Sequence, residues 1–404
     1  MVIFLPSKTK LFEEFLCNLL KKIGDKKMKK CVIIPDSFKG SLSSIEVCNI
    51  IKEKVNEFFP KCNAIMIPVA DGGEGTVDTF IYSLKAEKVN LKVKNAFGEV
   101  IDVYYGRIKN KAIIEVAQVV GLVSAEGRED PSTTSTYGVG QIISHAIEHG
   151  CNEVFIGLGG SCTNDCGVGA ASALGTVFKN KNGKEFIPVG KNLNDVEYID
   201  ISKTLEKLKN CKVTAMCDID NPMYGENGAA FVFAPQKGAD ENMVKMLDNN
   251  LRALSEKIKK NLNKDVSNIK GSGAAGAFGA GVCAFFNGEL KSGIEIILDL
   301  IDFDNLISDA DIIFTGEGQI DSQSLNGKVV IGISKRAKKQ NIPVIVLVGS
   351  IGEGAEKVYD EGVSAIFSIN QKAEDYSISR FKAKENLEKT IDSLLRYYDV
   401  ISKN

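Results

Sequence analysis

Residues 31–44 read CVIIPDSFKGSLSS, and this stretch decides how the rest of the chain is interpreted. CVIIP is a short, apolar, partly β-branched run, which is typical of a buried strand. Ser43 and Glu46 then match a capping box, which predicts a helix beginning directly afterwards. A simple connection needs only a turn, whereas this one carries Asp36, Ser37 and Lys39. The stretch therefore predicts a strand–loop–helix unit whose loop is equipped to hold a ligand.

The alternation of strand and helix recurs at both ends of the chain. NAIMIPV (63–69) follows the first helix, and DIIF (311–314) and PVIVLVG (343–349) are continuous apolar runs of the kind buried in parallel sheets. Residues 89–117 contain β-rich runs whose links are too short for helices, which predicts an antiparallel meander. We therefore expect an α/β protein with a Rossmann- or flavodoxin-like parallel sheet and an inserted α/β domain containing antiparallel strands.

The boundaries of the expected domains follow from this alternation. The discontinuous domain with the parallel sheet is expected at 28–70 and 285–404, and the inserted domain at 71–284. Residues 11–23 have apolar residues at helical spacing and are followed by GDKKMKK (24–30) and then the first strand. We interpret residues 1–27 as an N-terminal extension outside the fold. Within the inserted domain, GAASALGTVF (169–178) is expected to form a buried helix.

Composition and charge argue against several classes of protein. The chain has 404 residues and a formal net charge of −2, so no global field favours nucleic acid or an anionic membrane. No apolar run approaches the ~20 residues needed to cross a bilayer. Scattered cysteines without a secretory signal favour the reducing cytoplasm. His145 and His149 lack the nearby thiols that would complete a zinc site. Nothing in the sequence predicts the oligomeric state.

Glycine-rich stretches recur where strands are expected to end, which is where open α/β sheets bind ligands. These stretches carry acids, hydroxyls and a lysine. Carboxylates can hold Mg²⁺ or accept a proton, and lysine can neutralise phosphate oxygens, so the set suits phosphoryl transfer. Asp and Ser can instead merely cap helices and close turns. The polar residues in question are Asp36, Ser37, Lys39, Asp71, Glu74, Asn164, Asp165, Glu317 and Asp321.

Familiar nucleotide and hydrolase motifs are absent or misplaced. No G-x-x-x-x-G-K-[ST] occurs, which argues against a P-loop ATPase. GSGAAG (271–276) matches G-x-G-x-x-G but follows a polar segment instead of a strand. We therefore expect GSGAAGAFGAGVCAF (271–285) to form a tightly packed helix or a loop near the active cleft. G-x-S-x-G is also absent, and both histidines lie in one helical segment, which leaves no Ser-His-Asp candidate.

Several long motifs nevertheless occur in a characteristic order: IIPDSFKGSLSS, PVADGGEGT, TSTYGVGQ, GLGGSCTNDCGVG, GSGAAGAFGAGV and FTGEGQIDSQSLNGKVV. Together they resemble the bacterial glycerate kinase family, from about residue 28 to about residue 400. The resemblance implies ATP-dependent phosphorylation of D-glycerate to 2-phosphoglycerate, with ATP and Mg²⁺ as cofactors, by two α/β domains. Cys162 and Cys166 stand where the family often has other small residues, and we expect little effect from them.

This interpretation gives each polar residue an expected role. The catalytic residues are Asp165, as the candidate base, Lys39 and Asp71. The substrate-binding residues are Asp36, Ser37, Asn164, Gly72, Gly73 and Glu74. The residues that bind ATP or its phosphates are Gly316, Glu317, Gly318, Asp321 and Lys328. The candidate ligands of Mg²⁺ are Asp71 and Glu317.

Other functions remain open at this point. The main alternative is a kinase that acts on a related small hydroxy acid, or at the 3-hydroxyl of glycerate. A nicotinamide-dependent oxidoreductase would rest on GSGAAG alone. A two-domain solute-binding protein also closes on small acids, but it would have no need of several acids beside glycine-rich turns.

Overall fold

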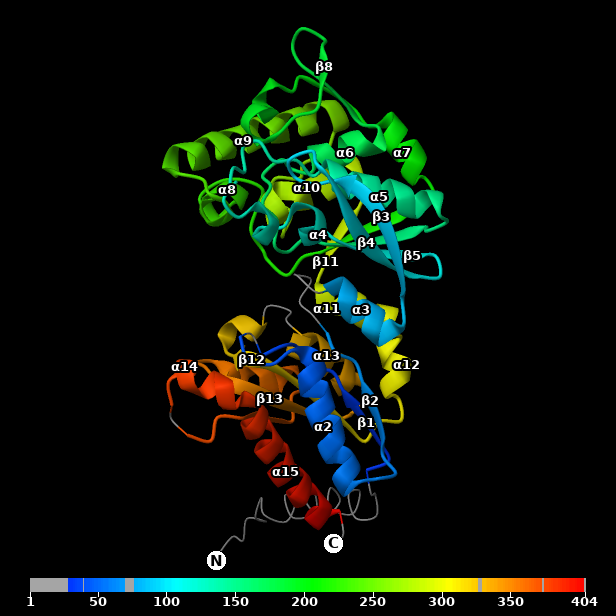
Figure 1. Cartoon of the computed structure of the whole chain (residues 1–404), viewed down its shortest axis with the longest axis vertical. Helices are drawn as coiled ribbons and strands as arrows, with labels where there is room; N and C mark the ends of the chain where they lie inside the picture. The colour runs from blue at the N-terminus through cyan, green and yellow to red at the C-terminus, as the bar shows by residue number, and fades with distance from the viewer. Residues whose placement is uncertain (1–27, 39, 70–75, 326–328, 373, 403–404) are drawn as a thin grey trace, which may run out of the picture. The chain divides into compact units, whose positions relative to one another are not determined.

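The computed structural model describes residues 28–38, 40–69, 76–325, 329–372 and 374–402. By their contacts these residues divide into two compact units. The first contains the described residues up to Val69 and from Ile301 onward, and the second contains those in between. Each unit has its own main sheet, one parallel and one with antiparallel strands (Figure 1). The α/β class expected from the sequence is confirmed.

The division differs in one detail from the domain boundaries expected above. The sequence placed residues 285–300 with the parallel sheet, whereas their contacts place them in the second unit. The proposed extension at 1–27 lies outside the described residues. That each unit is a separate domain stays a prediction.

The first unit contains a sheet of five parallel strands in the order β14-β13-β12-β1-β2. From β1 the chain adds β2 on one side and later adds β12, β13 and β14 on the other, which is the flavodoxin-like order. The direction of growth therefore reverses between β1 and β12, and ligands bind at such switch points. The strands are β1 Lys30–Ile33, β2 Asn63–Met66, β12 Ile312–Ile320, β13 Val344–Ile351 and β14 Ala365–Ser368.

Helix α2 (Ser44–Phe58) follows β1 and begins with the capping box that the sequence predicts. The Ser43 hydroxyl accepts from the Glu46 backbone N–H at 3.2 Å, and the Ser43 N–H donates to the Glu46 carboxylate at 2.8 Å. Such a cap typically contributes about 1 kcal/mol to stability. It fixes the point at which the loop after β1 ends.

The helices of the first unit cover both faces of its sheet. Helices α2 and α15 (Ala383–Ile401) pack against each other and share one buried apolar core with β1 and β2 (Figure 1). Helix α13 (Val329–Lys339) contacts β12 and β13, but its buried residues do not belong to that core, which places it on the other face. The shorter helices are α12 Phe303–Ile307 and α14 Tyr376–Ser379.

The second unit contains a six-stranded sheet in the order β11-β10-β6-β5-β4-β3. Strands β3, β4 and β5 pair antiparallel, which confirms the predicted meander, and β5, β6, β10 and β11 pair in parallel. A smaller sheet has the order β8-β7-β9. The strands are β3 Glu87–Lys94, β4 Val100–Ile108, β5 Lys111–Glu115, β6 Glu153–Gly157, β7 Val177–Lys179, β8 Glu185–Phe186, β9 Tyr198–Asp200, β10 Lys212–Met216 and β11 Glu289–Lys291.

The helix expected at residues 169–178 is shorter than the sequence indicates. Helix α6 (Val168–Leu174) ends at Gly175, which adopts a left-handed conformation with φ of +110°. Val177 and Phe178 belong to β7, so the helix prediction is wrong for residues 175–178. The other helices of this unit are α3 Thr76–Leu84, α4 Ala117–Val120, α5 Tyr137–Glu148, α7 Ser202–Leu208, α8 Ala229–Phe233, α9 Glu241–Leu262, α10 Ala274–Phe285 and α11 Gly293–Leu300.

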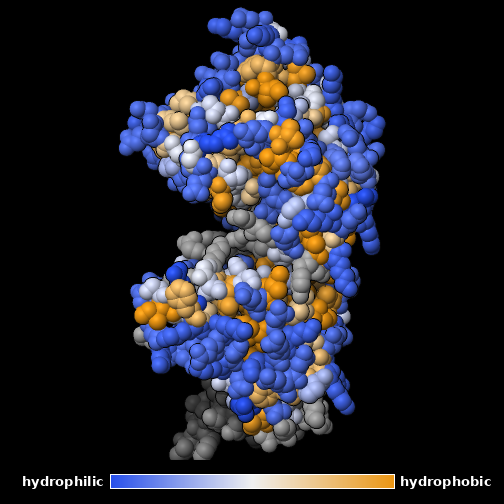
Figure 2. Space-filling model, in the orientation of Figure 1, coloured by the Kyte–Doolittle hydropathy of each residue, from blue (hydrophilic) through white to orange (hydrophobic). Residues whose placement is uncertain are grey.

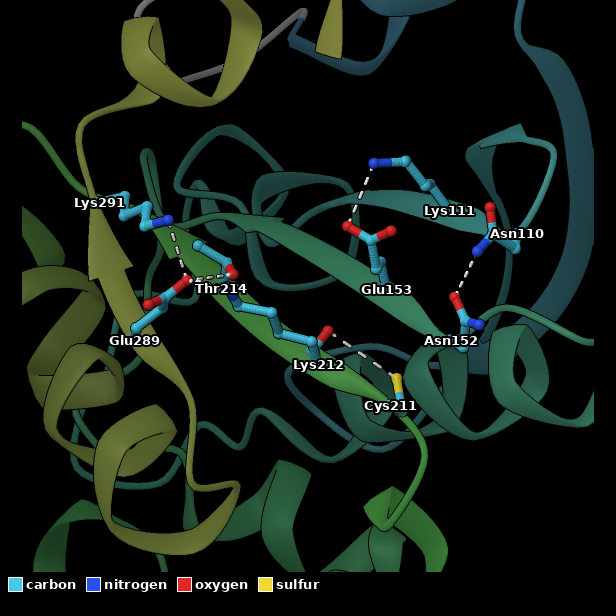
Figure 3. A network of polar contacts seen from close by, with 9 residues as sticks. All are labelled: Asn110, Lys111, Asn152, Glu153, Cys211, Lys212, Thr214, Glu289 and Lys291. Atoms are coloured by element: carbon cyan, nitrogen blue, oxygen red, sulfur yellow. Dashed lines mark hydrogen bonds and ion pairs between the residues drawn. The ribbon is translucent and has the colours of Figure 1, made fainter. Parts of the chain in front are cut away.

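Charged side chains line the amino ends of the parallel strands in this sheet (Figure 3). Lys111 on β5 pairs with Glu153 on β6 at 3.1 Å, and Lys212 on β10 pairs with Glu289 on β11 at 2.7 Å. These side chains are partly exposed, so each pair contributes at most about 1 kcal/mol. They lie at the edge opposite the strands' carboxyl ends, and we interpret them as a surface feature that favours the register.

The visible surface of each unit consists mainly of hydrophilic residues, with apolar residues in smaller patches (Figure 2). None of the helices in the described part of the chain combines the length and apolar character needed to cross a bilayer.

Candidate functional site

The loop after β1 is fastened to β12 at the switch point of the first unit. The Asp36 backbone N–H donates to the Gly316 carbonyl at 2.9 Å, and the Thr315 hydroxyl donates to the Ile34 carbonyl at 2.8 Å. The Asp36 carboxylate is buried and accepts from the Ser37 N–H at 2.6 Å. Asp36 and Ser37 are therefore held beside the carboxyl-terminal part of β12.

Glu317 brings a second buried carboxylate to this edge of the sheet, because it lies on β12 next to Gly316. The neighbouring glycines have a packing role. A Cβ at Gly316 would overlap the Leu347 carbonyl oxygen on β13, and a Cβ at Gly349 would come within 2.5 Å of the Gly318 carbonyl oxygen. Gly316 and Gly349 therefore let β12 and β13 approach closely. Glu317 lies between Gly316 and Gly318 on β12.

Asp321 follows β12 and closes the next turn. Its carboxylate accepts from the Gln319 side-chain amide at 3.0 Å, and its backbone N–H donates to the Ser324 hydroxyl at 3.3 Å. The structure therefore places Asp36, Ser37, Gly316, Glu317, Gly318 and Asp321 along the carboxyl ends of two adjacent parallel strands.

In the second unit, the loop between β6 and α6 is organised by Asp165. The side chain is fully buried, and its carboxylate accepts from the Thr136 N–H at 2.9 Å and the Thr136 hydroxyl at 2.8 Å. It also accepts from the N–H groups of Gly167 and Gly169 at 3.1 and 3.3 Å. Burial raises the pKa of Asp165, and these hydrogen bonds partly oppose that rise. Asp165 thus ties the start of α6 to the segment before α5.

Replacing Asp165 by asparagine is expected to lower the free energy of unfolding by roughly 2 kcal/mol or more. Either orientation of the amide would place its NH₂ group against N–H donors that now meet a carboxylate oxygen. Urea denaturation of the variant and of the wild type measures the difference. A variant as stable as wild type would show that these four hydrogen bonds do not anchor the loop.

Asn164 and Thr163 precede Asp165 and differ from it in having unsatisfied polar atoms. Both side chains are 0% exposed. Within the described part of the chain, the Thr163 hydroxyl and both polar atoms of the Asn164 amide have no hydrogen-bond partner. Each buried unsatisfied group costs about 1–3 kcal/mol. The fold thus maintains three such atoms on two consecutive residues, which is typical of a binding site.

Lys237 is a further residue of this site, and the sequence analysis missed it. It ends a short 3₁₀ turn, Pro235–Lys237, and is 3% exposed. Its Nζ donates to the Thr163 carbonyl at 2.7 Å and to the Ser161 hydroxyl at 3.3 Å. The only signal in the sequence is that Lys237 lies in Pro-Gln-Lys-Gly, a turn-forming stretch. Such a stretch does not indicate that the lysine is buried.

Burial lowers the pKa of Lys237 to about 8, while the nearby Cys162 and Asp165 act in the opposite direction. The unfolded chain keeps the ordinary value of 10.5. Between these values the unfolded state binds more protons, so stability rises with pH across this window and is flat below it. Relative to Lys237→Met, the free energy of unfolding is expected to rise by up to about 1.4 kcal/mol per pH unit there. Denaturation of wild type and Lys237→Met at several pH values between about 8 and 10.5 measures this slope. A difference in the free energy of unfolding that stays constant with pH would contradict the prediction.

GSGAAG packs directly against the same loop. Ala275, Gly276 and Ala277 are all left-handed, with φ of 53°, 65° and 67°, at the start of α10. The Gly276 carbonyl accepts from the Cys166 N–H at 3.0 Å. Alanine rarely adopts this conformation outside over-determined sites, and here Ala275 and Ala277 both do. The prediction of a tightly packed helix is confirmed for most of the segment, but its first turn is left-handed.

Six of the expected site residues lie outside the described residues: Lys39, Asp71, Gly72, Gly73, Glu74 and Lys328. The described ones form two groups. Asp36, Ser37, Gly316–Gly318 and Asp321 lie along one edge of the sheet in the first unit. Asn164 and Asp165 lie in one loop of the second unit, and Lys237 contacts that loop at Thr163. In the described part of the chain, no three His, Cys, Asp or Glu side chains gather as a metal cluster.

The model of the glycerate kinase family matches residues 31–399. The chain belongs to the glycerate kinase family. This confirms the resemblance seen in the sequence motifs and identifies the chain as a kinase, a transferase of phosphoryl groups. The match spans both units.

Similar proteins cover nearly the whole length of this family member. A glycerate kinase of Bacillus cereus is 42% identical over 93% of this chain and 99% of its own length. A glycerate 2-kinase of Escherichia coli is 44% identical over 84% of this chain and 90% of its own length. A crystal structure of a putative glycerate kinase 2 from Salmonella typhimurium superposes with a TM-score of 0.80 at 36% identity, covering 92% of this chain and 98% of that one.

Proposed function

We propose that this kinase transfers the terminal phosphoryl group of ATP to the 2-hydroxyl of D-glycerate and releases 2-phosphoglycerate and ADP. The observation that carries the proposal is the meeting of Asp36 and Gly316–Gly318 at the switch point of a flavodoxin-like sheet. In a member of this family, that edge is the expected place for phosphate groups. The E. coli relative, named as a glycerate 2-kinase, supports the 2-hydroxyl as the acceptor.

In this proposal each group of residues has a separate task. Gly316, Gly318 and Asp321, together with Lys328, bind the phosphates of ATP at the carboxyl end of β12. Asp36, Ser37, Asn164, Gly72, Gly73 and Glu74 bind D-glycerate. Lys39 and Asp71 contact the reacting groups, and Asp165 takes the proton of the attacking hydroxyl. Because Asp165 also anchors its loop, a folded Asp165 variant with normal kcat would remove it as the base.

Mg²⁺ fits this site. It usually takes one or two carboxylates together with waters and phosphate oxygens, so a larger acidic cluster is not required. Glu317 has a buried carboxylate at the switch point and would hold the ion with Asp71. When bound, Mg²⁺ would neutralise charge on the phosphate oxygens during transfer.

We propose that the protein works in the cytoplasm. All nine cysteines in the described part of the chain are free thiols, and six of them are buried. Free thiols of this kind persist in a reducing compartment, whereas exported proteins tend to use disulfides.

A coupled assay of ADP release tests the activity. The purified protein is supplied with ATP, MgCl₂ and D-glycerate, and then with each component omitted in turn. We expect ADP release only in the complete mixture. Release with L-glycerate or another small hydroxy acid, but not with D-glycerate, would favour the related kinase considered above and overturn the proposed substrate.

A further inference from the structure

Three buried polar atoms in the loop after β6 indicate what the site binds. They are the Thr163 hydroxyl and the two polar atoms of the Asn164 amide, which have no partner among the described residues. The amide offers a donor group, NH₂, and an acceptor group, the carbonyl oxygen, whichever way its side chain is assigned. A ligand that satisfies it must therefore both accept and donate hydrogen bonds.

The loop that carries these atoms is held by two neighbours. Lys237 donates to the Thr163 carbonyl. Gly276 lies so close to the loop that an added Cβ would be 2.5 Å from the Asn164 Cα, and its carbonyl accepts from the Cys166 N–H. The position of Asn164 is therefore fixed by its neighbours, while its own side chain makes no hydrogen bond in the described structure.

Lys237 supplies a cation to the same loop, because its Nζ donates to the carbonyl of Thr163 itself. A lysine ammonium group has three N–H donors, and two of them are used by Thr163 and Ser161. One donor therefore remains for an anionic ligand. Asp165, whose charge favours the protonated form of Lys237, already accepts four hydrogen bonds from other groups.

We propose that Asn164, Thr163 and Lys237 form the subsite that holds the carboxylate and one hydroxyl of the hydroxy-acid substrate. The carboxylate accepts from Lys237 and from the Asn164 NH₂ group, and the hydroxyl donates to the Asn164 carbonyl oxygen. Phosphate oxygens of ATP have no proton to donate to that oxygen, so a hydroxy acid fits better than the phosphates of a nucleotide. The inference rests on the proposed function and adds Lys237 and Thr163 to its substrate-binding residues.

The polar atoms of Asn164 and Thr163 are covered in this structure. Substrate binding in this subsite therefore requires the surroundings of residues 161–167 to open locally. The bound acid is then shielded from water, which strengthens its interaction with Lys237.

Asn164→Leu is the decisive variant, because leucine has nearly the shape of asparagine and no polar atoms. Removing unsatisfied buried groups does not weaken the unliganded fold, so we expect an unchanged or higher Tm. Because leucine cannot hydrogen-bond to the substrate's carboxylate and hydroxyl, we expect KM for D-glycerate to rise roughly 10- to 100-fold. KM for ATP is expected to change less than about twofold. A markedly lower Tm, or an unchanged KM for D-glycerate, would overturn the proposal.

Lys237→Met tests the cation, with Lys245→Met as the matched control, since Lys245 is exposed on α9 of the same unit. Calorimetry without ATP uses D-glycerate, propanoate, glycerol and inorganic phosphate as probes. We expect wild type and the control to bind D-glycerate best and glycerol not at all, and Lys237→Met to lose binding. Binding of phosphate in preference to D-glycerate, or normal binding by Lys237→Met, would contradict the subsite.

The wild-type protein separates this inference from the proposed function. If wild type does not phosphorylate D-glycerate, the proposed function fails. If wild type phosphorylates it but Asn164→Leu keeps its KM, only the subsite fails.

Discussion

Replacing Glu317 by glutamine is expected to lower kcat roughly 100-fold or more. Glu317 is buried on β12, one residue beyond the carbonyl that fastens the Asp36 loop. Glutamine keeps the shape of the side chain but removes the charge that would hold Mg²⁺ opposite the phosphates. Because the shape is kept, the free energy of unfolding is expected to fall by no more than about 2 kcal/mol. Steady-state kinetics at several Mg²⁺ concentrations provides the measurement.

Glu356→Gln provides the control for this variant. Glu356 is an exposed glutamate in the same unit, so its replacement is expected to leave kcat unchanged. If Glu317→Gln retains the kcat and the Mg²⁺ dependence of the control, Glu317 is not a metal ligand, and its buried carboxylate has a structural role alone.

Gly276→Ala is expected to destabilise the protein by roughly 3 kcal/mol or more. The residue has φ of +65°, and an added Cβ would overlap the Thr163 carbonyl oxygen. The methyl group therefore meets both backbone strain and a steric clash with the loop that carries Asn164. Thermal or urea denaturation measures the loss of stability, and the same displacement is expected to reduce activity in any fraction that remains folded.

Gly98→Ala separates these two effects. Gly98 also has positive φ, +86°, but an added Cβ there would have nothing within 4 Å. Replacing Gly98 by alanine is expected to lower the free energy of unfolding by about 1–2 kcal/mol, which is the strain of an alanine in the left-handed conformation. If Gly276→Ala and Gly98→Ala lower the free energy of unfolding by the same amount, the close packing of Gly276 against Thr163 does not add to the effect of Gly276→Ala.

Local signals in the sequence were sufficient for much of the fold. The apolar run at 31–35 and the capping box at Ser43 fixed the first strand and helix, and the short links within 89–117 identified the meander. The same local reasoning was wrong at residues 175–178, where apolar residues after α6 continue into β7. Gly175 was the available signal, since a left-handed glycine commonly ends a helix.

The candidate site was only partly predictable, because its geometry depends on contacts distant in sequence. Asp36 and Gly316 share a hydrogen bond across the sheet, and motif order placed both at strand ends. Lys237 could not be found in this way. It reaches Thr163 across 74 positions of sequence, and only the folded structure shows that it is buried. Glycine-rich motifs were equally ambiguous, since Gly316 is required by the packing of β12 on β13.

Phosphorus NMR of the reaction product tests the central claim most directly. The protein is incubated with ATP, MgCl₂ and D-glycerate, and the spectrum is compared with authentic 2-phosphoglycerate and 3-phosphoglycerate. We expect a new resonance at the position of 2-phosphoglycerate, growing in step with ADP. A resonance of 3-phosphoglycerate would contradict the proposed acceptor hydroxyl, and the absence of any phosphorylated glycerate from a folded protein that binds ATP would contradict the proposed substrate.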